Sequence, residues 1–234
     1  MAARLGRREF LGLAAGVTTA TVATATGAVW AKGLRVTDGP YGPLQGPDAH
    51  GLMLPEGFEA RVVAHYDRPV GSSSYRWHIF PDGGAVFPAD DEGWVYVSNS
   101  EAREEGTGGA GAIRFDAEGA IVDAYSILSG TMVNCAGGAT PWGTWLSGEE
   151  HEQGRVWECD PMGEADAVPL PALGVFLHEA SAVDPDLEQV YLTEDAADGR
   201  WYRFTPDSYP RPRVWSAGGG AGRRSGEGEM ASAT

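Results

Sequence analysis

The chain has 234 residues, 33 of them acidic and 17 basic, with a formal net charge of −16 at pH 7. Such an acidic protein is poorly suited to bind nucleic acid or an anionic lipid surface, because both would repel it. The charge suits a protein that gathers cations, since clustered carboxylates are ligands for hard metal ions. The need for solubility would by itself explain most of this net negative charge.

The N-terminal sequence MAARLGRREFLGLAAG resembles a twin-arginine export signal, with Arg7 and Arg8 ahead of Phe10. The apolar stretch over residues 11–29 is rich in Ala, Gly and Thr, which favours a cleaved signal over the alternative, a membrane anchor. We expect a signal peptide over residues 1–31, and export by the twin-arginine machinery to the periplasm or the medium. We expect no stable membrane insertion after cleavage.

After the signal, a Gly- and Pro-rich lead is followed by short strands separated by turns. GFEARVVAHY, from Gly57, alternates enough to predict a strand. The tetrapeptide Pro81–Gly84, PDGG, predicts a turn, and AVF and WVYV after it predict strands. No stretch predicts an amphipathic helix, and 8 Trp, 8 Tyr and 34 Gly are typical of an all-β protein.

A repeating unit organises these strands. WVYVSNSE, TWLSGEE and VYLTED each end in acid and are each followed by a loop and a glycine-led strand. The terminal acids are Glu101, the pair Glu149 and Glu150, and the pair Glu194 and Asp195. The polar pairs before the units are Trp77–His78, Asn134–Cys135 and His178–Glu179. A repeat of about 40–50 residues has the size of a propeller blade; a β-sandwich would also give short strands, but not this register of carboxylates.

Three repeats are fewer than the roughly four to eight blades of a closed propeller. We therefore expect an incomplete β-propeller of four-stranded antiparallel sheets within residues 32–210, folded from about Pro40 to Pro206. The WVYV, GTWL and VYLT strands should hold equivalent positions in successive sheets. From residue 211 the chain is Gly-, Ser- and Arg-rich without strand periodicity, which predicts a disordered tail over residues 211–234.

The stretch Asn134–Glu150, NCAGGATPWGTWLSGEE, joins a thiol, a glycine turn, a strand and two carboxylates. Thiolate suits iron or zinc, and carboxylate suits calcium or manganese. The simpler interpretation is a buried cysteine and a solvated acidic loop; the recurrence of the pattern favours a metal site. Cys135 could instead pair with Cys159 in an oxidising compartment, but we expect a free thiol near the propeller axis, with Glu179 and the SGEE carboxylates converging on it.

Strings such as WHIFPDGGAVFP, GWVYVSNSE, NCAGGATPWGTWLSGEE, HEASAVDP and VYLTEDAADGRWYRFTP resemble, in their order, the PhoX family of exported alkaline phosphatases. The resemblance extends from about Gly51 to Pro210. It implies a β-propeller with an iron–calcium cluster on its axis that hydrolyses phosphomonoesters. The chain departs from the family in having Gly148 where a second cysteine is frequent, and SNSE in place of a His–Glu strand end.

By this resemblance Cys135 would be the iron thiolate. The implied metal ligands with oxygen donors are Glu149 or Glu150, Glu179, Glu194, Asp195, Glu101 and Asn99. The implied catalytic residues are Glu149, Glu150 and Glu179. The implied cofactors are calcium and iron, and the implied substrate is a small phosphate ester.

We therefore expect an exported metal-dependent phosphomonoesterase. The family continues into further blades that also supply site residues, so we expect this chain to keep recognisable site residues but to hydrolyse poorly. The alternatives are a non-catalytic propeller remnant that binds calcium or a partner, and a calcium-dependent lactonase-like hydrolase. No GxSxG, HExxH or P-loop string supports other hydrolase chemistry.

Overall fold

The computed structural model describes residues 40–206 and 228–233. The predicted signal peptide lies outside these residues. The chain divides into two compact units, Met1–Arg61 and Val62–Thr234. Within the described residues, none of the helical structure is long and apolar enough to cross a membrane; it consists of the short 3-10 turn η1 (Pro171–Leu173).

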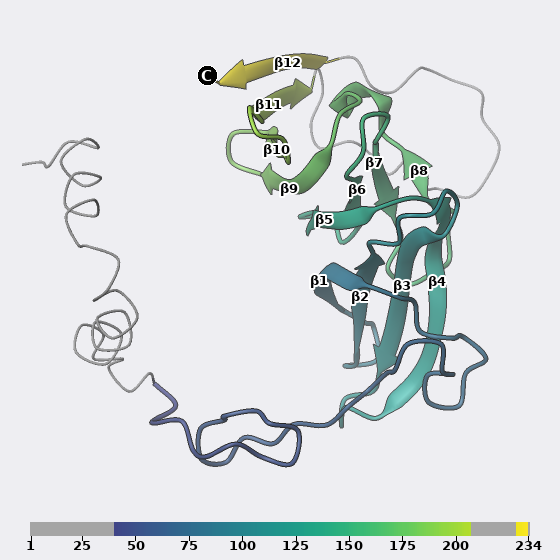
Figure 1. Ribbon diagram of the computed structural model, residues 1–234, viewed down its shortest axis with the longest axis vertical. Coiled ribbons are helices and arrows are strands. Elements are labelled where there is room, and N and C mark those ends of the chain that lie inside the picture. The colour runs from purple at the N-terminus through teal and green to yellow at the C-terminus, as the bar shows by residue number, and fades with distance from the viewer. Residues whose placement is uncertain (1–39, 207–227, 234) are drawn as a thin grey trace, which may run out of the picture. The chain divides into compact units, whose positions relative to one another are not determined.

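Unit Val62–Thr234 contains three four-stranded sheets (Figure 1). The first sheet consists of β1 (Pro81–Pro88), β2 (Trp94–Ser100), β3 (Gly108–Phe115) and β4 (Ile121–Thr131). The second consists of β5 (Asn134–Ala139), β6 (Trp145–Glu149), β7 (Val156–Cys159) and β8 (Val168–Pro169). The third consists of β9 (His178–Asp184), β10 (Gln189–Glu194), β11 (Trp201–Pro206) and β12 (Gly228–Ala233).

Within each sheet the strands pair antiparallel and follow chain order. This up-and-down order is that of a propeller blade. The strands β2, β6 and β10, which carry the WVYV, TWL and VYLT sequences, are each the second strand of their sheet. The predicted all-β, incomplete propeller and the equivalence of these three strands are therefore confirmed.

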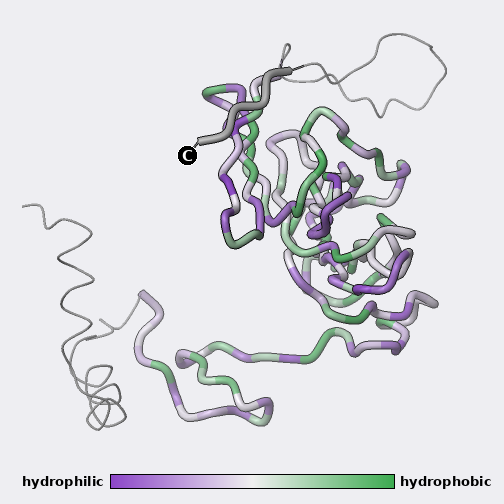
Figure 2. Tube along the Cα trace, turned by 45° about the horizontal axis from the view of Figure 1, so that its top comes forward, coloured by the Kyte–Doolittle hydropathy of each residue, from purple (hydrophilic) through white to green (hydrophobic). Residues whose placement is uncertain are grey.

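Apolar side chains join neighbouring sheets. Val95 and Val97 of β2 are fully buried in a cluster with Trp145 of β6 and Cys159 of β7. A second cluster joins β6 and β7 to Leu192 of β10 and to β11. Green hydrophobic stretches alternate with purple hydrophilic ones along the described chain (Figure 2). These contacts stabilise the fold by about 25 cal/mol for each Å² of apolar surface that they bury.

Three expectations about the strands were wrong. GFEARVVAHY forms no strand, since no neighbour pairs with it and Phe58 and Val62 are exposed. The predicted turn Pro81–Gly84 is the start of β1, because pairing with β2 extends this glycine-rich segment. In the first unit, the residues equivalent to Asn134–Cys135 and His178–Glu179 are therefore Pro81–Asp82 and not Trp77–His78.

The predicted disordered tail needs correction as well, because residues 228–233 form β12. This strand pairs with β11 along its length, from Trp201 opposite Ala233 to Pro206 opposite Gly228. An unpaired edge of β11 would present free backbone donors and acceptors, and a segment of small residues can satisfy them. The local sequence carries no apolar alternation to signal such a strand.

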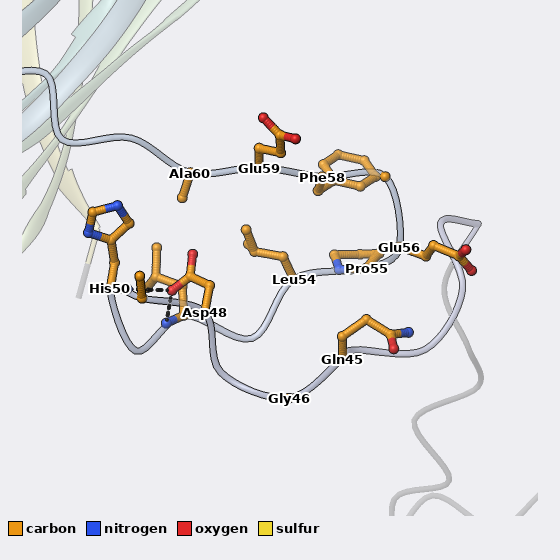
Figure 3. Close-up of a pocket in the computed structure, with 13 residues that line it drawn as sticks. Gln45, Gly46, Asp48, His50, Leu54, Pro55, Glu56, Phe58, Glu59 and Ala60 are labelled. Carbon is orange, nitrogen blue, oxygen red and sulfur yellow. Dashed lines mark hydrogen bonds between the residues drawn. The ribbon is translucent and has the colours of Figure 1, made fainter.

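The described part of unit Met1–Arg61 is a loop rather than a sheet. An isolated bridge joins Leu44 to Pro55, and the rings of Tyr41 and Phe58 meet edge to face at 5.2 Å. The Asp48 carboxylate accepts the backbone N–H groups of His50 and Leu52 and closes the turn (Figure 3). A shallow cavity of about 400 Å³ lies within this loop.

Close approach between sheets gives the first testable prediction. A Cβ atom at Gly138 of β5 would lie 1.9 Å from the backbone oxygen of Ser181 in β9, whereas one at Gly46 would meet nothing within 4 Å. We expect Gly138→Ala to lower the free energy of unfolding by about 1–3 kcal/mol, the usual effect of overpacking. Gly46→Ala should leave it unchanged or raise it by about 0.4–1 kcal/mol. Urea unfolding of both variants measures this, and equal stabilities would contradict the close packing of β5 on β9.

Candidate metal centre

The same β-bulge occurs at the start of the first strand in every sheet. Two residues of the first strand oppose one of the second between Pro81 and Gly84, between Asn134 and Gly137, and between His178 and Ser181. A bulge redirects side chains and is common beside active sites. The residues that follow Pro81, Asn134 and His178 in these bulges are Asp82, Cys135 and Glu179.

A second set of equivalent residues follows the second strands. Backbone N–H groups of Glu101, Glu150 and Asp195 donate to the carbonyl groups just before the three first strands, those of Phe80, Val133 and Leu177, over 2.9, 2.8 and 3.2 Å. Each sheet therefore offers two chemically useful positions at one end, one in the bulge and one after the second strand. In the sheet order these pairs are Asp82 and Glu101, Cys135 and Glu150, and Glu179 and Asp195.

The bulged ends of neighbouring first strands lie against one another. A Cβ atom at Gly83 would be 2.6 Å from the Cα atom of Ala136, which places β1 against β5. A Cβ atom at Gly148 would be 2.9 Å from the backbone oxygen of His178, which places β6 against β9. Gly148, where the PhoX pattern often has cysteine, therefore adjoins the backbone just before Glu179.

Within this junction three side chains converge. Ligand atoms of Cys135, Glu150 and Glu179 all lie within 4.8 Å of one another. The Cys135 Sγ–H donates to Glu179 Oε2 over 3.4 Å. Cys135 is buried, and the two glutamates are half-buried. Because the three residues come from β5, from the end of β6 and from β9, the site exists only when the second and third sheets pack together.

Burial and mutual repulsion of the acidic groups raise the pKa values of Cys135 and Glu150. Burial raises the pKa of the Cys135 thiol, and the carboxylates of Glu150, Glu179 and Asp82 raise it further. The pKa of Glu150 is raised by burial and by the nearby carboxylates of Asp195 and Glu179, against a lowering contribution from Cys135. Acidic groups that hold one another's pKa values up form a site that a bound cation would stabilise.

Asn99 supports the site from within the core. Its Nδ2 donates to the backbone oxygens of Cys135 and Ala136, each over 2.9 Å. Its Oδ1 accepts from Trp145 Nε1 and Ser147 Oγ, also over 2.9 Å. The side chain is fully buried, and its oxygen already has two partners. In the structure Asn99 is a hydrogen-bonding support for the Cys135 backbone.

The carboxylate pairs at the strand ends divide into two roles. Glu149 is buried and accepts the backbone N–H groups of Met132 and Arg155 and the Trp157 Nε1–H. At the equivalent position, Glu194 accepts the backbone N–H of Arg200 and the hydroxyl of Tyr202. Both hold the hairpin that follows, whereas the next residue in each pair, Glu150 or Asp195, faces the junction.

The remaining candidates are also placed. Glu101 occupies the position equivalent to Glu150, but its carboxylate is 3.0 Å from the guanidinium of Arg103 and stands outside the cluster of three. Cys135 and Cys159 are both free thiols, and β6 lies between their strands. Asp82 is the residue that sequence reasoning missed. Its signal was the spacing of the repeat, which Pro81–Gly84 obscured by its turn-like composition.

Fold and site together define a β-propeller with a candidate thiolate–carboxylate metal centre. The family model described as alkaline phosphatase PhoX matches residues 91–157 and 151–217. These matches together cover more than half of the chain, and the protein belongs to the PhoX family of alkaline phosphatases. The matched residues include Cys135, Glu150 and Glu179. Neither a comparison with curated proteins nor one with solved structures found a match.

The split within the carboxylate pairs can be tested by isosteric substitution. Glu149→Gln replaces an accepting oxygen with an NH₂ group that cannot accept, and we expect it to lower the free energy of unfolding by about 2 kcal/mol. Glu150→Gln removes a carboxylate from an acidic cluster and should leave stability equal or higher. Urea unfolding in chelator-treated buffer compares the two variants. Equal destabilisation by both would show that Glu150, too, serves the fold.

Proposed function

We propose that this protein is a metal-dependent phosphomonoesterase whose metal ions are held by Cys135, Glu150 and Glu179. The observation that carries the proposal is the convergence of a thiol and two carboxylates within 4.8 Å in a member of an alkaline phosphatase family. The carboxylates of Asp82 and Asp195 stand outside this group of three but raise the pKa of Cys135 and of Glu150, respectively.

The donor set fits iron and calcium, the metals that the family resemblance implies. A thiolate is a soft ligand that suits iron, while carboxylate oxygens suit calcium. The raised pKa of both Cys135 and Glu150 reflects burial and crowding of acidic groups. Cations would offset that crowding and favour the deprotonated ligands.

Bound metal ions would supply Lewis acidity toward the phosphoryl oxygens and an activated water molecule. The chain's own contribution is positioning. Asn99 holds the backbone carbonyls of Cys135 and Ala136 in place, and Glu149 holds the hairpin beyond Glu150. Ligands fixed by such supporting hydrogen bonds bind metal with less loss of conformational freedom.

We further propose that the protein acts in the periplasm or outside the cell. Arg7 and Arg8 precede a mildly apolar segment, as in twin-arginine signals. Fusing residues 1–31 to a reporter and replacing both arginines with lysine tests the route. Export that persists in the lysine variant would exclude it.

Metal content and hydrolysis test the proposed activity together. The purified chain should retain calcium and iron in elemental analysis and hydrolyse a chromogenic phosphomonoester slowly and in a chelator-sensitive way. Cys135→Ser should lose iron and reduce kcat/KM by about 100-fold or more, within the range seen when metal ligands or their supports are changed. Cys159→Ala is the matched control, because it removes the other buried thiol without touching the site.

Three outcomes would overturn the proposal. Metal retention without hydrolysis would assign the chain to a non-catalytic metal-binding protein. Hydrolysis that survives both chelator and Cys135→Ser would place the activity elsewhere. If the wild-type chain holds no metal, and Glu150→Gln and Glu179→Gln have the same metal content as the wild type, then the three residues do not form a metal centre.

A further inference from the structure

A cavity of about 620 Å³ lies at the end of the first sheet where β1 begins and β2 ends. The lining residues that matter here are Tyr66, Ile79, Phe80, Glu101, Arg103 and Glu104. Its volume falls in the range of about 300–1,000 Å³ that is usual for small-molecule sites. Cys135, Glu150 and Glu179 are not among its lining residues, although Glu101, a predicted ligand, is.

Backbone hydrogen bonds link the cavity wall to the segments that carry the candidate metal centre. Phe80 stands two residues before Asp82, and its carbonyl accepts the N–H of Glu101. Ala102, also in the lining, accepts the N–H of Val133 over 2.8 Å, and the carbonyl of Val133 in turn accepts the N–H of Glu150 over 2.8 Å. Val133 therefore connects Ala102 in the cavity wall to the backbone of Glu150 through two hydrogen bonds.

Aromatic surface dominates one wall of the cavity. Phe80 is 56% exposed and Tyr66 is 61% exposed, so both rings are available to a ligand. Phe80 has φ of 47°, a left-handed conformation that is uncommon for a bulky residue. Val133, just before β5, has the same conformation with φ of 51°, so the first two sheets share this backbone geometry, while the aromatic side chain is particular to the first sheet.

The charges of the lining argue against a polyanionic ligand. Glu101 and Glu104 outnumber Arg103, whose guanidinium is already 3.0 Å from Glu101. A second phosphate group or a carboxylate would meet two acidic side chains there, whereas a flat uncharged group would meet aromatic rings. Ring–ring contact of this kind contributes about 0.5–1.5 kcal/mol per pair.

We propose that this cavity is the subsite for the alcohol portion of the phosphate ester and that it selects an uncharged aromatic group. The proposal rests on the proposed phosphomonoesterase function. In the reaction, water adds to phosphorus, the P–O bond to the alcohol breaks, and the alcohol oxygen takes up a proton to leave as a neutral aromatic alcohol beside Phe80 and Tyr66. Esters of small aliphatic alcohols fill the cavity poorly, and bisphosphates are repelled by Glu101 and Glu104.

Binding of phosphonates, which are not hydrolysed, tests the subsite independently of activity. Saturation-transfer NMR with the metal-loaded chain should give tighter binding of benzylphosphonate than of methylphosphonate. Phe80→Leu and Tyr66→Leu keep apolar bulk but remove the rings, and each should weaken benzylphosphonate about 3–10-fold while methylphosphonate is unchanged. Val86→Ala changes an exposed side chain elsewhere on β1 and should alter neither ligand.

The outcomes separate this proposal from the proposed function. Selective loss of benzylphosphonate binding in the ring-less variants would support the subsite, even if the chain does not hydrolyse esters. A lack of hydrolysis would count only against the proposed activity. Where hydrolysis is measurable, the ratio of kcat/KM for phenyl phosphate to that for glycerol phosphate should fall about 3–10-fold in the ring-less variants. Unchanged benzylphosphonate binding in both variants, or equal loss of the two phosphonates, would overturn the subsite.

Discussion

The β-bulge shared by β1, β5 and β9 is the constraint on which the rest of the structure depends. It displaces one residue of each first strand from regular pairing. The displaced residues, Asp82, Cys135 and Glu179, are presented at the junction of the sheets instead of entering the alternation of a flat strand. Without the bulge, the strand register would carry Cys135 past Glu150 and Glu179, since a shift of one residue reverses the face of every side chain.

Two kinds of buried polar group maintain this arrangement. Asn99 crosses from the first sheet to the second and satisfies all of its hydrogen-bonding capacity with β5 and β6. Glu149 and Glu194 each close the hairpin that begins after them. A buried polar group that is fully paired specifies one arrangement of its neighbours, because any other arrangement leaves it unsatisfied.

The crowded acidic groups of the candidate metal centre disfavour folding, whereas the hydrogen bonds that support them favour it. Cys135, Glu150 and Glu179 are held close together at the expense of mutual repulsion and burial, as their raised pKa values show for the first two. Such groups are characteristic of functional sites, where local stability is given up for chemistry. The cavity at the end of the first sheet adds an apolar surface, because the aromatic rings of Tyr66 and Phe80 line it together with charged side chains.

The sequence by itself determined the architecture and the residue types of the site. The recurring acid-ended strands predicted separate sheets with β2, β6 and β10 in equivalent places, because short-range alternation and spacing are local properties. It could not choose between Glu149 and Glu150, since both follow the same strand and only packing against β7 and β9 assigns one to the hairpin and the other to the site. It also concealed Asp82 within a turn-like PDGG segment, and β12 within a tail of small residues. Only tertiary pairing decided these, because a bulge register and an edge-strand partner depend on residues far away in the chain.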